Sequence, residues 1–272
     1  MSPVFDCADP AQLLTGMRQA RQAIGRGQLV VIPTDTVYGV AADAFSPAAV
    51  AGLLKAKGRG RQQPPPVLVS GRAALAALVE YVPAEVDALV ERFWPGGLTI
   101  VLPAQPSLSW DLGDTEGTVA VRMPDHPIAL ELLEETGPLA VSSANRTKLP
   151  AAVSAGMAQD MLGDSVAVYL DAGPSATGIA STIIDATALV TATDPAEREV
   201  RVLRDGAVSR DELREVLGSL LVPADDDAET DADAAGEEPP PATSADPRAA
   251  FAEALRRSRE TETQRGSGRE NA

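Results

Sequence analysis

The amino-acid sequence predicts an α/β domain with a twisted sheet of mixed strand direction, flanked by helices. Short β-branched runs such as 29–32, 118–122 and 182–185 are interspersed with amphipathic stretches through residues 1–222. They do not follow the strict strand–helix–strand order of a parallel sheet, which favours a sheet of mixed direction. With 272 residues, 44% of them hydrophobic, the chain can bury one large core or two small ones.

Each predicted element rests on a local pattern of apolar spacing and on its flanking residues. Helix signals include Ser46 before Pro47, Gly58 after the same helix, and a capping box formed by Ser209 and Glu212. The stretch 33–45 is expected to be a polar turn. Helices are expected over 10–25, 47–58, 71–79, 83–93, 127–135, 154–162 and 209–218, and strands over 29–32, 67–69, 98–102, 118–122, 139–142, 166–170, 182–185 and 200–203.

The charge of the chain is strongly acidic and unevenly distributed. The net charge is −16, and the 13 acidic and 6 basic residues from Pro223 onward contribute −7, which leaves −9 for residues 1–222. This balance argues against a protein that coats nucleic acid with a broad basic surface. We expect one folded domain at 1–222 and an acidic, disordered tail at 223–272 that is dispensable for chemistry, because the composition of the tail cannot offset ordering entropy.

The location of the protein is expected to be a reducing cytoplasm. Cys7 is the single cysteine, so neither an internal disulfide nor a cysteine-based zinc cluster is expected. The N-terminal residues form no apolar signal segment, and no window approaches the roughly 20 apolar residues of a membrane span. No membrane association is therefore predicted.

Polar and cationic residues gather around the strand 29–32 and the helix after it. Thr34 to Thr36 place hydroxyls and a carboxylate where the strand ends, which is where open α/β sheets position ligands. Two of the three lysines of the chain, Lys55 and Lys57, lie with Arg59 at the end of the helix 47–58. The simpler interpretation is that these cations only complement the helix dipole.

These residues belong to a set of six motifs, covering residues 10–220, that resembles the YrdC-like threonylcarbamoyl-AMP synthase family. The resemblance implies a nucleotidyltransferase that converts L-threonine, bicarbonate and ATP into threonylcarbamoyl-AMP and pyrophosphate. A downstream threonylcarbamoyl transferase complex would then modify an adenosine beside the tRNA anticodon. The motifs are PTDTVYG at 33–39 with KGR at 57–59, FWPG at 93–96, VAVRMP at 119–124, SSAN at 142–145, STII at 181–184 and LRDG at 203–206.

The resemblance also implies roles for individual residues. No GxxxxGK[ST] phosphate loop occurs in the sequence, so Lys57 and Arg59 are the expected catalytic cations that stabilise phosphate charge. Arg61 could contact phosphate or face solvent. The expected threonine-binding residues are Thr36, Arg122, Val141 and Ser181, and the expected ATP-binding residues are Lys57, Arg59, Gln63, Thr118, Ser143, Asn145, Ala151 and Arg204.

Several of these residues have a structural alternative. Arg122 could form an ion pair with a core aspartate instead of holding the threonine carboxylate in bidentate fashion, and Asn145 could simply form a turn. His126 is expected to cap or pack a helix, and Trp94 to border the core. No metal site is expected from the residues themselves, and magnesium is expected to arrive with ATP.

The sequence departs from the family pattern in the loop at 60–68. Gly60 replaces a proline, the segment 63–65 replaces a second motif, and a histidine found in many relatives near Leu68 is absent. A different class of function remains open, namely an RNA-binding or ribosome-maturation factor using the same concave face. The acidic core and few aromatic residues favour at most weak tRNA binding. A carbamoyl-transferring maturation module would need metal-binding cysteines that the sequence lacks.

Overall fold

The computed structural model describes residues 2–108 and 110–223. Among them, residues up to 147 and from 151 onward form one compact unit, whereas Lys148–Pro150 are grouped with a second unit. The predicted tail lies outside the described residues from 224 onward. The boundary placed at residue 223 therefore stays a prediction.

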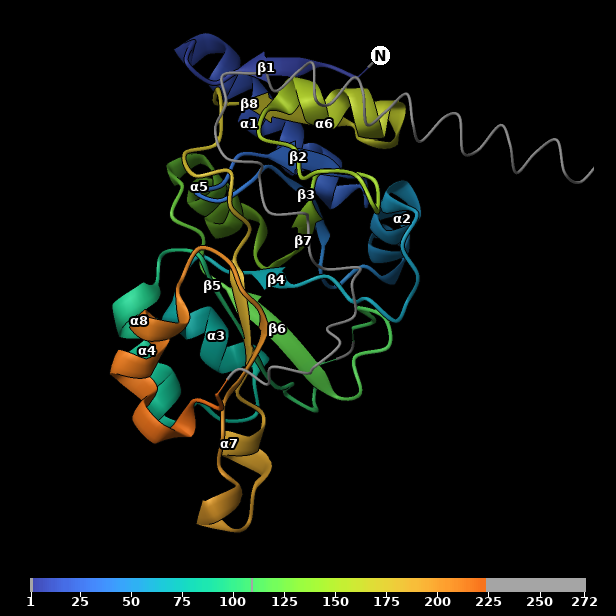
Figure 1. Ribbon diagram of the computed structural model, residues 1–272. Helices are drawn as coiled ribbons and strands as arrows, with labels where there is room; N and C mark the ends of the chain where they lie inside the picture. Colours follow the sequence, from blue (N-terminus) through green and yellow to red (C-terminus); the bar gives the residue numbers. More distant parts are fainter. Residues whose placement is uncertain (1, 109, 224–272) are drawn as a thin grey trace, which may run out of the picture. The chain divides into compact units, whose positions relative to one another are not determined.

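The unit is built on a mixed ten-stranded sheet, which confirms the predicted α/β class (Figure 1). The strand order is β1-β8-β2-β3-β7-β4-β6-β5-β9-β10, with both parallel and antiparallel neighbours. The strands are β1 Val4–Asp6, β2 Val30–Ile32, β3 Gly39–Asp43, β4 Val67–Leu68, β5 Leu98–Pro103, β6 Thr118–Arg122, β7 Leu139–Ser143, β8 Val168–Asp171, β9 Thr182–Asp185 and β10 Arg201–Arg204.

Each predicted helix begins and ends within one residue of its expected bounds, whereas the short helix α7 was not predicted. Ser46 accepts a hydrogen bond from the Ala49 amide, and Gly58 ends the same helix in the left-handed conformation with φ 65°. The capping box of Ser209 and Glu212 is also present. The helices are α1 Pro10–Gly25, α2 Pro47–Lys57, α3 Arg72–Leu78, α4 Ala84–Phe93, α5 Pro127–Thr136, α6 Ala155–Leu162, α7 Ala188–Thr191 and α8 Arg210–Leu217.

Strand β3 corrects the expectation that residues 33–45 are only a polar turn. Its residues pair with β2 on one side and with β7 on the other. Residues 39–42 of β3 are glycine, valine and alanine, which are small enough for the crowded position between β2 and β7. The polar residues before Gly39 made this run hard to recognise as a strand. A Cβ atom on Gly39 would lie 2.6 Å from Val141 Cγ1, so only glycine fits there without movement of a neighbour. The three-residue β1 was also missed, because so short a segment gives little periodicity.

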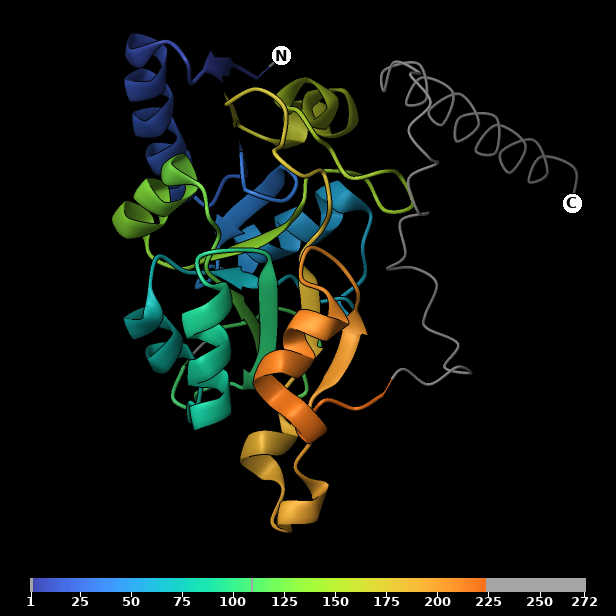
Figure 2. The ribbon, with the colours of Figure 1, turned by 60° about the vertical axis from the view of Figure 1, so that its left-hand side comes forward.

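Two hydrophobic cores lie on the sheet. The first contains alternate residues of β5, β6 and β9 and is covered by α3, α4 and α8, of which α4 and α8 lie side by side (Figure 2). The second packs α1 and α5 against β2, β3, β4, β7 and β8. Because side chains alternate along a strand, Val119 and Val121 point into the first core, whereas Thr118, Ala120 and Arg122 point to the opposite face. Ala120 is only half-buried, so that face is partly open.

Candidate active site

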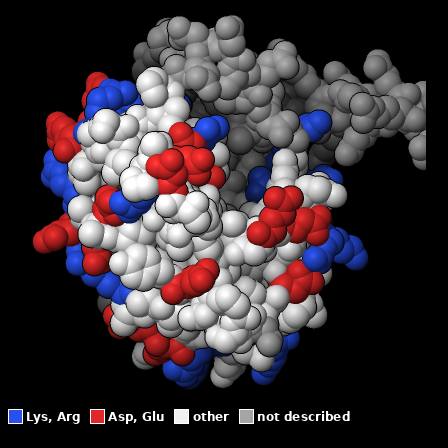
Figure 3. Space-filling view, turned by 90° about the horizontal axis from the view of Figure 1, so that it is seen from below, with Lys and Arg blue, Asp and Glu red and all other residues white. Residues whose placement is uncertain are grey.

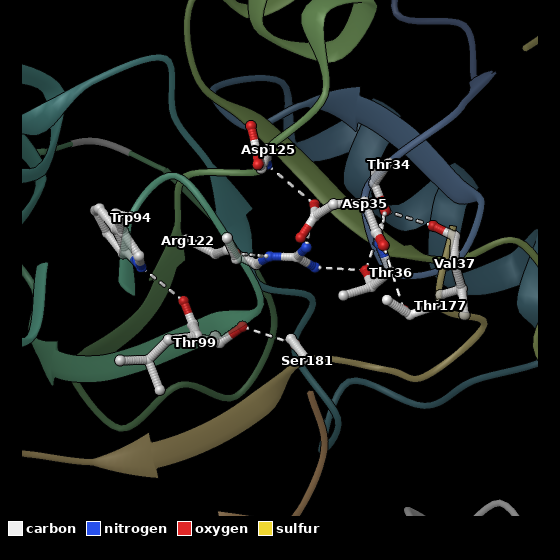
Figure 4. A network of polar contacts seen from close by, with 12 residues as sticks. Thr34, Asp35, Thr36, Val37, Trp94, Thr99, Arg122, Asp125, Thr177 and Ser181 are labelled. Carbon is white, nitrogen blue, oxygen red and sulfur yellow. Dashed lines mark hydrogen bonds and ion pairs between the residues drawn. The ribbon is translucent and has the colours of Figure 1, made fainter. Parts of the chain in front are cut away.

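Arg122 is the centre of a polar network at the end of β6 (Figure 4). Its side chain is 7% exposed, and its Nη2 donates to Asp35 Oδ1 at 2.6 Å. Nη1 donates to Thr36 Oγ1 at 2.9 Å, and Nε donates to the Gly96 carbonyl at 2.8 Å. The guanidinium thus uses three of its five N–H groups on described residues. The aspartate partner considered as an alternative is therefore present, as Asp35.

Asp35 lies at the strand end where the sequence predicted a ligand site, although it was given no role of its own there. Its Oδ1 also accepts a hydrogen bond from the Asp125 amide at 3.0 Å, so that one oxygen joins two segments. Asp35, Thr36 and Asp125 line a cavity of about 450 Å³, together with His126 and residues 172–177. The signal available in the sequence was the position of Asp35 between two predicted polar residues at a strand end.

Ser181 and Arg204 form a second cluster next to Arg122. Ser181 Oγ lies 2.9 Å from Thr99 Oγ1, and Arg204 donates to the Ser181 carbonyl from Nη2 at 2.7 Å and from Nε at 3.0 Å. The buried Thr99 was not predicted as a site residue. Burial, and secondarily the positive charges of Arg122 and Arg59, lowers the pKa of Arg204 to about 10. Arg204 is therefore close enough to Arg122 and to Arg59 to be repelled by both.

Lys57, one of the two expected catalytic cations, is buried. It is 1% exposed, and Nζ donates to the carbonyls of Ser143 and Asn145 and to Asn145 Oδ1, the last at 3.1 Å. Among the described residues, no carboxylate forms an ion pair with this ammonium group. Burial, and secondarily the charge of Arg59, lowers the pKa of Lys57 to about 7.

Arg59 lies between these two regions. It is half-buried, and its Nη1 donates to Ser142 Oγ at 3.3 Å. It lowers the pKa values of both Lys57 and Arg204 through its charge. The four cations Lys57, Arg59, Arg122 and Arg204 therefore converge, and Asp35 forms an ion pair with one of them, Arg122.

The remaining predicted site residues lie at different distances from the cation cluster, and only some share the sheet face of Arg122. The strand register puts Thr118, Val141 and Ser143 on the same sheet face as Arg122. The Thr118 hydroxyl donates to the Thr115 carbonyl at 2.8 Å, at the opposite end of β6 from Arg122. Gln63 lies in the 60–66 loop without a side-chain hydrogen bond to a described residue. Ala151 is half-buried beside Ala152.

Arg61 faces solvent, which is one of its two expected positions, and it forms ion pairs there. Its side chain, 54% exposed, pairs with Asp111 at 2.8 Å and with Asp114 at 3.2 Å. His126 occupies the cap position of α5 without a side-chain capping bond, and its buried Nδ1 has no hydrogen-bond partner among the described residues. Burial lowers the pKa of His126. The predicted side-chain cap is thus not formed, whereas the buried Trp94 borders the first core as predicted.

Comparison with known families decides the classification. A family model of Sua5, YciO and YrdC proteins, described as telomere recombination, matches residues 22–206. The chain belongs to this family. A Mycobacterium tuberculosis protein provisionally named threonylcarbamoyl-AMP synthase is 53% identical over 218 residues, covering 80% of this chain and 96% of the relative. The Bacillus subtilis threonylcarbamoyl-AMP synthase is 34% identical over 206 residues, covering 75% of this chain and 57% of that protein.

Structural comparison places the chain in the same family. The crystal structure of Pyrococcus abyssi Sua5 complexed with L-threonine has a TM-score of 0.71 and 32% sequence identity, covering 82% of this chain and 63% of that one. Escherichia coli YciO, with a TM-score of 0.65 and 22% identity, covers 78% of this chain and the whole of its own, and supports the fold alone. None of the helices in 2–108 and 110–223 is long and apolar enough to cross a membrane.

Proposed function

We infer that this member of the Sua5, YciO and YrdC family is an L-threonylcarbamoyladenylate synthase, a nucleotidyltransferase. It converts L-threonine, bicarbonate and ATP into threonylcarbamoyl-AMP and pyrophosphate, for the threonylcarbamoyladenosine modification of tRNA. The observation that carries this proposal is the convergence of four cations near the carboxylate of Asp35. Such a site suits a triphosphate together with an amino acid.

The Arg122–Asp35 pair is the proposed anchor for threonine. A free amino acid carries an ammonium and a carboxylate group, and this pair offers one charge of each sign within 2.6 Å. The two remaining N–H groups of Arg122 can donate hydrogen bonds to the threonine carboxylate. Thr36 and Ser181 supply hydroxyls beside it, and Val141 supplies apolar contact to the threonine methyl group.

The α2 end is the proposed site for the phosphates of ATP. Lys57 and Arg59 would stabilise charge on the α-phosphate and on the departing pyrophosphate. Ser143 and Asn145 hold Lys57 in place and lie beside it. The other proposed ATP contacts are Gln63, Thr118, Ala151 and Arg204.

The products define the bonds that change. The threonine nitrogen bonds to the bicarbonate carbon and water leaves, which gives a carbamate. A carbamate oxygen then bonds to the α-phosphorus of ATP, and the bond from this phosphorus to the β-phosphate bridging oxygen breaks, which releases pyrophosphate. Asp35 Oδ2 has no hydrogen-bond partner among the described residues and could accept the proton lost by the ammonium group.

Magnesium is proposed to enter as the MgATP substrate complex. Within residues 2–108 and 110–223, no group of three or more His, Cys, Asp or Glu side chains could hold a metal ion. Phosphate oxygens and water would then supply most of the ligands that Mg²⁺ prefers. The ion would neutralise part of the triphosphate charge, and the described cations would neutralise the remainder.

The product links the enzyme to a downstream partner. Threonylcarbamoyl-AMP is a mixed anhydride that water can hydrolyse, so a threonylcarbamoyl transferase complex must consume it promptly. Weak tRNA binding and a cytoplasmic location are further parts of this proposal.

Pyrophosphate release tests the proposed function. We expect release from MgATP only when both threonine and bicarbonate are present, with threonylcarbamoyl-AMP identified by mass spectrometry. Release that is independent of threonine would contradict the synthase activity. Absence of release together with tight RNA binding would instead favour the ribosome-maturation alternative.

A further inference from the structure

The cavity of about 450 Å³ beside Asp35 has charged lining groups of one sign. They are the carboxylates of Asp35 and Asp125, and neither Lys nor Arg lines the cavity among the described residues. On the outer face seen in Figure 3, by contrast, basic and acidic side chains are interspersed. The negative charge disfavours an anionic substrate such as bicarbonate or triphosphate in this cavity, and it favours a positively charged species.

Two buried polar atoms on the cavity wall have no hydrogen-bond partner among the described residues. They are Nδ1 of His126 and Oγ of Ser175. Nearly all buried polar groups in proteins are paired with protein atoms or with water. A cavity of this size has room for several water molecules, each of which takes up about 30 Å³ and needs polar partners. The lining therefore suits a short chain of water molecules that reaches His126.

His126 lies between Asp35 and the molecular surface. The amide of Asp125, one residue before it, donates to Asp35 Oδ1 at 3.0 Å, and both Asp35 and His126 line the cavity. The His126 ring is half-buried, whereas the residues on either side of it in the sequence, 125 and 127, are exposed. The ring thus connects the cavity to solvent.

The imidazole of His126 is mostly neutral at neutral pH. Burial lowers its pKa, and the negative charges of Asp35 and Asp125 oppose this effect only in part. The segment 172–177 adds no titratable side chain to the cavity, and Tyr38 adds a hydroxyl that donates to a backbone carbonyl. A neutral imidazole has one nitrogen that can accept a proton, and it is a stronger base than a carboxylate.

Carbamate formation, the first step of the proposed reaction, releases one proton. The threonine ammonium group and bicarbonate give carbamate, water and H⁺. The threonine nitrogen loses two protons, of which one leaves with the bicarbonate hydroxyl as water and the other must leave the site. The four converging cations disfavour a path for this proton on their side. Asp35 Oδ2 and the cavity offer a path lined by negative charge instead.

We propose that His126 accepts this proton at Nδ1 from Asp35 Oδ2 through water in the cavity, and that its Nε2–H then gives up a proton to solvent. This inference rests on the proposed function. The nitrogen–hydrogen bond of threonine breaks, a bond from the proton to Nδ1 forms, and loss of the Nε2 proton returns the ring to a neutral tautomer. Because His126 acts behind Asp35 and contacts no substrate, it should affect turnover and not threonine affinity.

The pH dependence of pyrophosphate release by the full chain tests the proposal, at saturating threonine and MgATP and a fixed bicarbonate concentration. The kcat of the original chain should decline as pH falls below the His126 pKa, because a protonated ring accepts no further proton. His126→Gln stays polar but takes up no proton. Its kcat at pH 8 should be at least about tenfold lower, its KM for threonine nearly unchanged, and its low-pH decline abolished.

Two further variants separate proton transfer from a structural effect. Imidazole added to His126→Ala should raise kcat at least about threefold, whereas the same concentration of sodium chloride should not. Asp125→Asn is the matched control, because it changes the neighbouring residue and keeps the ring. It should move the low-pH decline to lower pH, since the Asp125 charge opposes the lowering of the His126 pKa by burial.

Nuclear magnetic resonance tests the coupling of His126 to Asp35 without turnover. His126 is the single histidine of the chain, so its ring signals are assigned directly. Asp35→Asn should lower the His126 pKa further, because it removes one of the two charges that oppose the effect of burial. If this variant does not fold, saturating threonine on the original chain makes the same test, since its ammonium group offsets the Asp35 charge. An unchanged His126 pKa would overturn the inference.

The kinetic outcomes distinguish this inference from the proposed function. Absence of release by the original chain at every pH contradicts the proposed function. Release by the original chain, with unaltered kcat and an unaltered low-pH decline in His126→Gln, overturns the role of His126 alone. A raised KM for threonine together with a loss of turnover that imidazole does not restore would show a structural role, and would also overturn it.

Discussion

The two cationic regions of the candidate site hold their charge in different ways. Lys57 is surrounded by carbonyl oxygens and has no carboxylate partner among the described residues, so its positive charge is only partly compensated. Arg122 is paired directly with Asp35. The first arrangement suits an anion such as phosphate, and the second suits a zwitterion such as an amino acid. Lys57 and Arg122 can thus bind different substrates, the triphosphate and the amino acid.

The largest expected effect is that of Lys57→Met on turnover. This variant keeps most of the buried side-chain volume but removes the charge proposed to face the phosphates, so kcat should fall about 100-fold or more. Initial rates of pyrophosphate release measure the effect, with Arg72→Ala as a surface control and circular dichroism as a check on folding. A folded Lys57 variant with near-normal kcat would remove the proposed phosphate role.

Arg122→Lys tests the other side of the comparison. It keeps a positive charge but loses the planar fork, so KM for threonine should rise about tenfold or more while KM for ATP changes little. Rates measured against each substrate decide the outcome. If only the ATP dependence changed, threonine would have to be moved away from this strand end.

Asp35→Asn should affect both stability and threonine use. It leaves the buried Arg122 charge without its carboxylate, which should lower the free energy of unfolding by about 3 kcal/mol or more. KM for threonine should rise because the ammonium group loses its counter-charge. Urea unfolding and threonine saturation measure these two effects, and an unchanged threonine dependence in folded protein would argue against zwitterion binding.

The low pKa of Lys57 predicts a proton-linked binding step. With a pKa near 7 in the folded protein and about 10.5 ordinarily, Lys57 is mostly neutral at pH 8, and this group should make the ligand-free fold more stable as pH rises from 7 toward 10. Triphosphate beside it should raise the pKa, so MgATP binding at pH 8 should take up as much as one proton. Calorimetry in buffers of different ionisation enthalpy measures this uptake, and Lys57→Met should abolish it.

Arg61→Ala should have the smallest effect. Its two ion pairs are exposed to solvent, and such pairs contribute little to stability. Pyrophosphate release should change less than about threefold. A much larger loss would mean that Arg61 leaves Asp111 and Asp114 to contact ATP during turnover.

Sequence patterns predicted the elements whose signals are local. The ends of α1 and α2 follow from their caps and prolines, and the residue span of β6 follows from its apolar run. Strand β3 was missed because its identity depends on its neighbours: a run of small residues becomes a strand only when β2 and β7 lie on both sides. Propensity alone does not contain that information.

In the candidate site too, local motifs predicted which residues matter, whereas their contacts depend on distant segments. Matched motifs indicated Lys57, Arg122 and Ser181, but not what each side chain contacts. The burial of Lys57 and the Arg122–Asp35 pair arise from segments more than 80 residues apart in sequence. Thr99 went unnoticed because a single threonine inside a strand carries no chemical signal until the register places it against Ser181.

The alternation of side chains along β6 has a genetic consequence. Val119 and Val121 are buried among helices, whereas the residues between and around them face the proposed chemistry. Temperature-sensitive alleles should therefore fall on every second codon of this five-residue strand. The codons between them should instead yield alleles that lose function at every temperature without loss of protein from the cell.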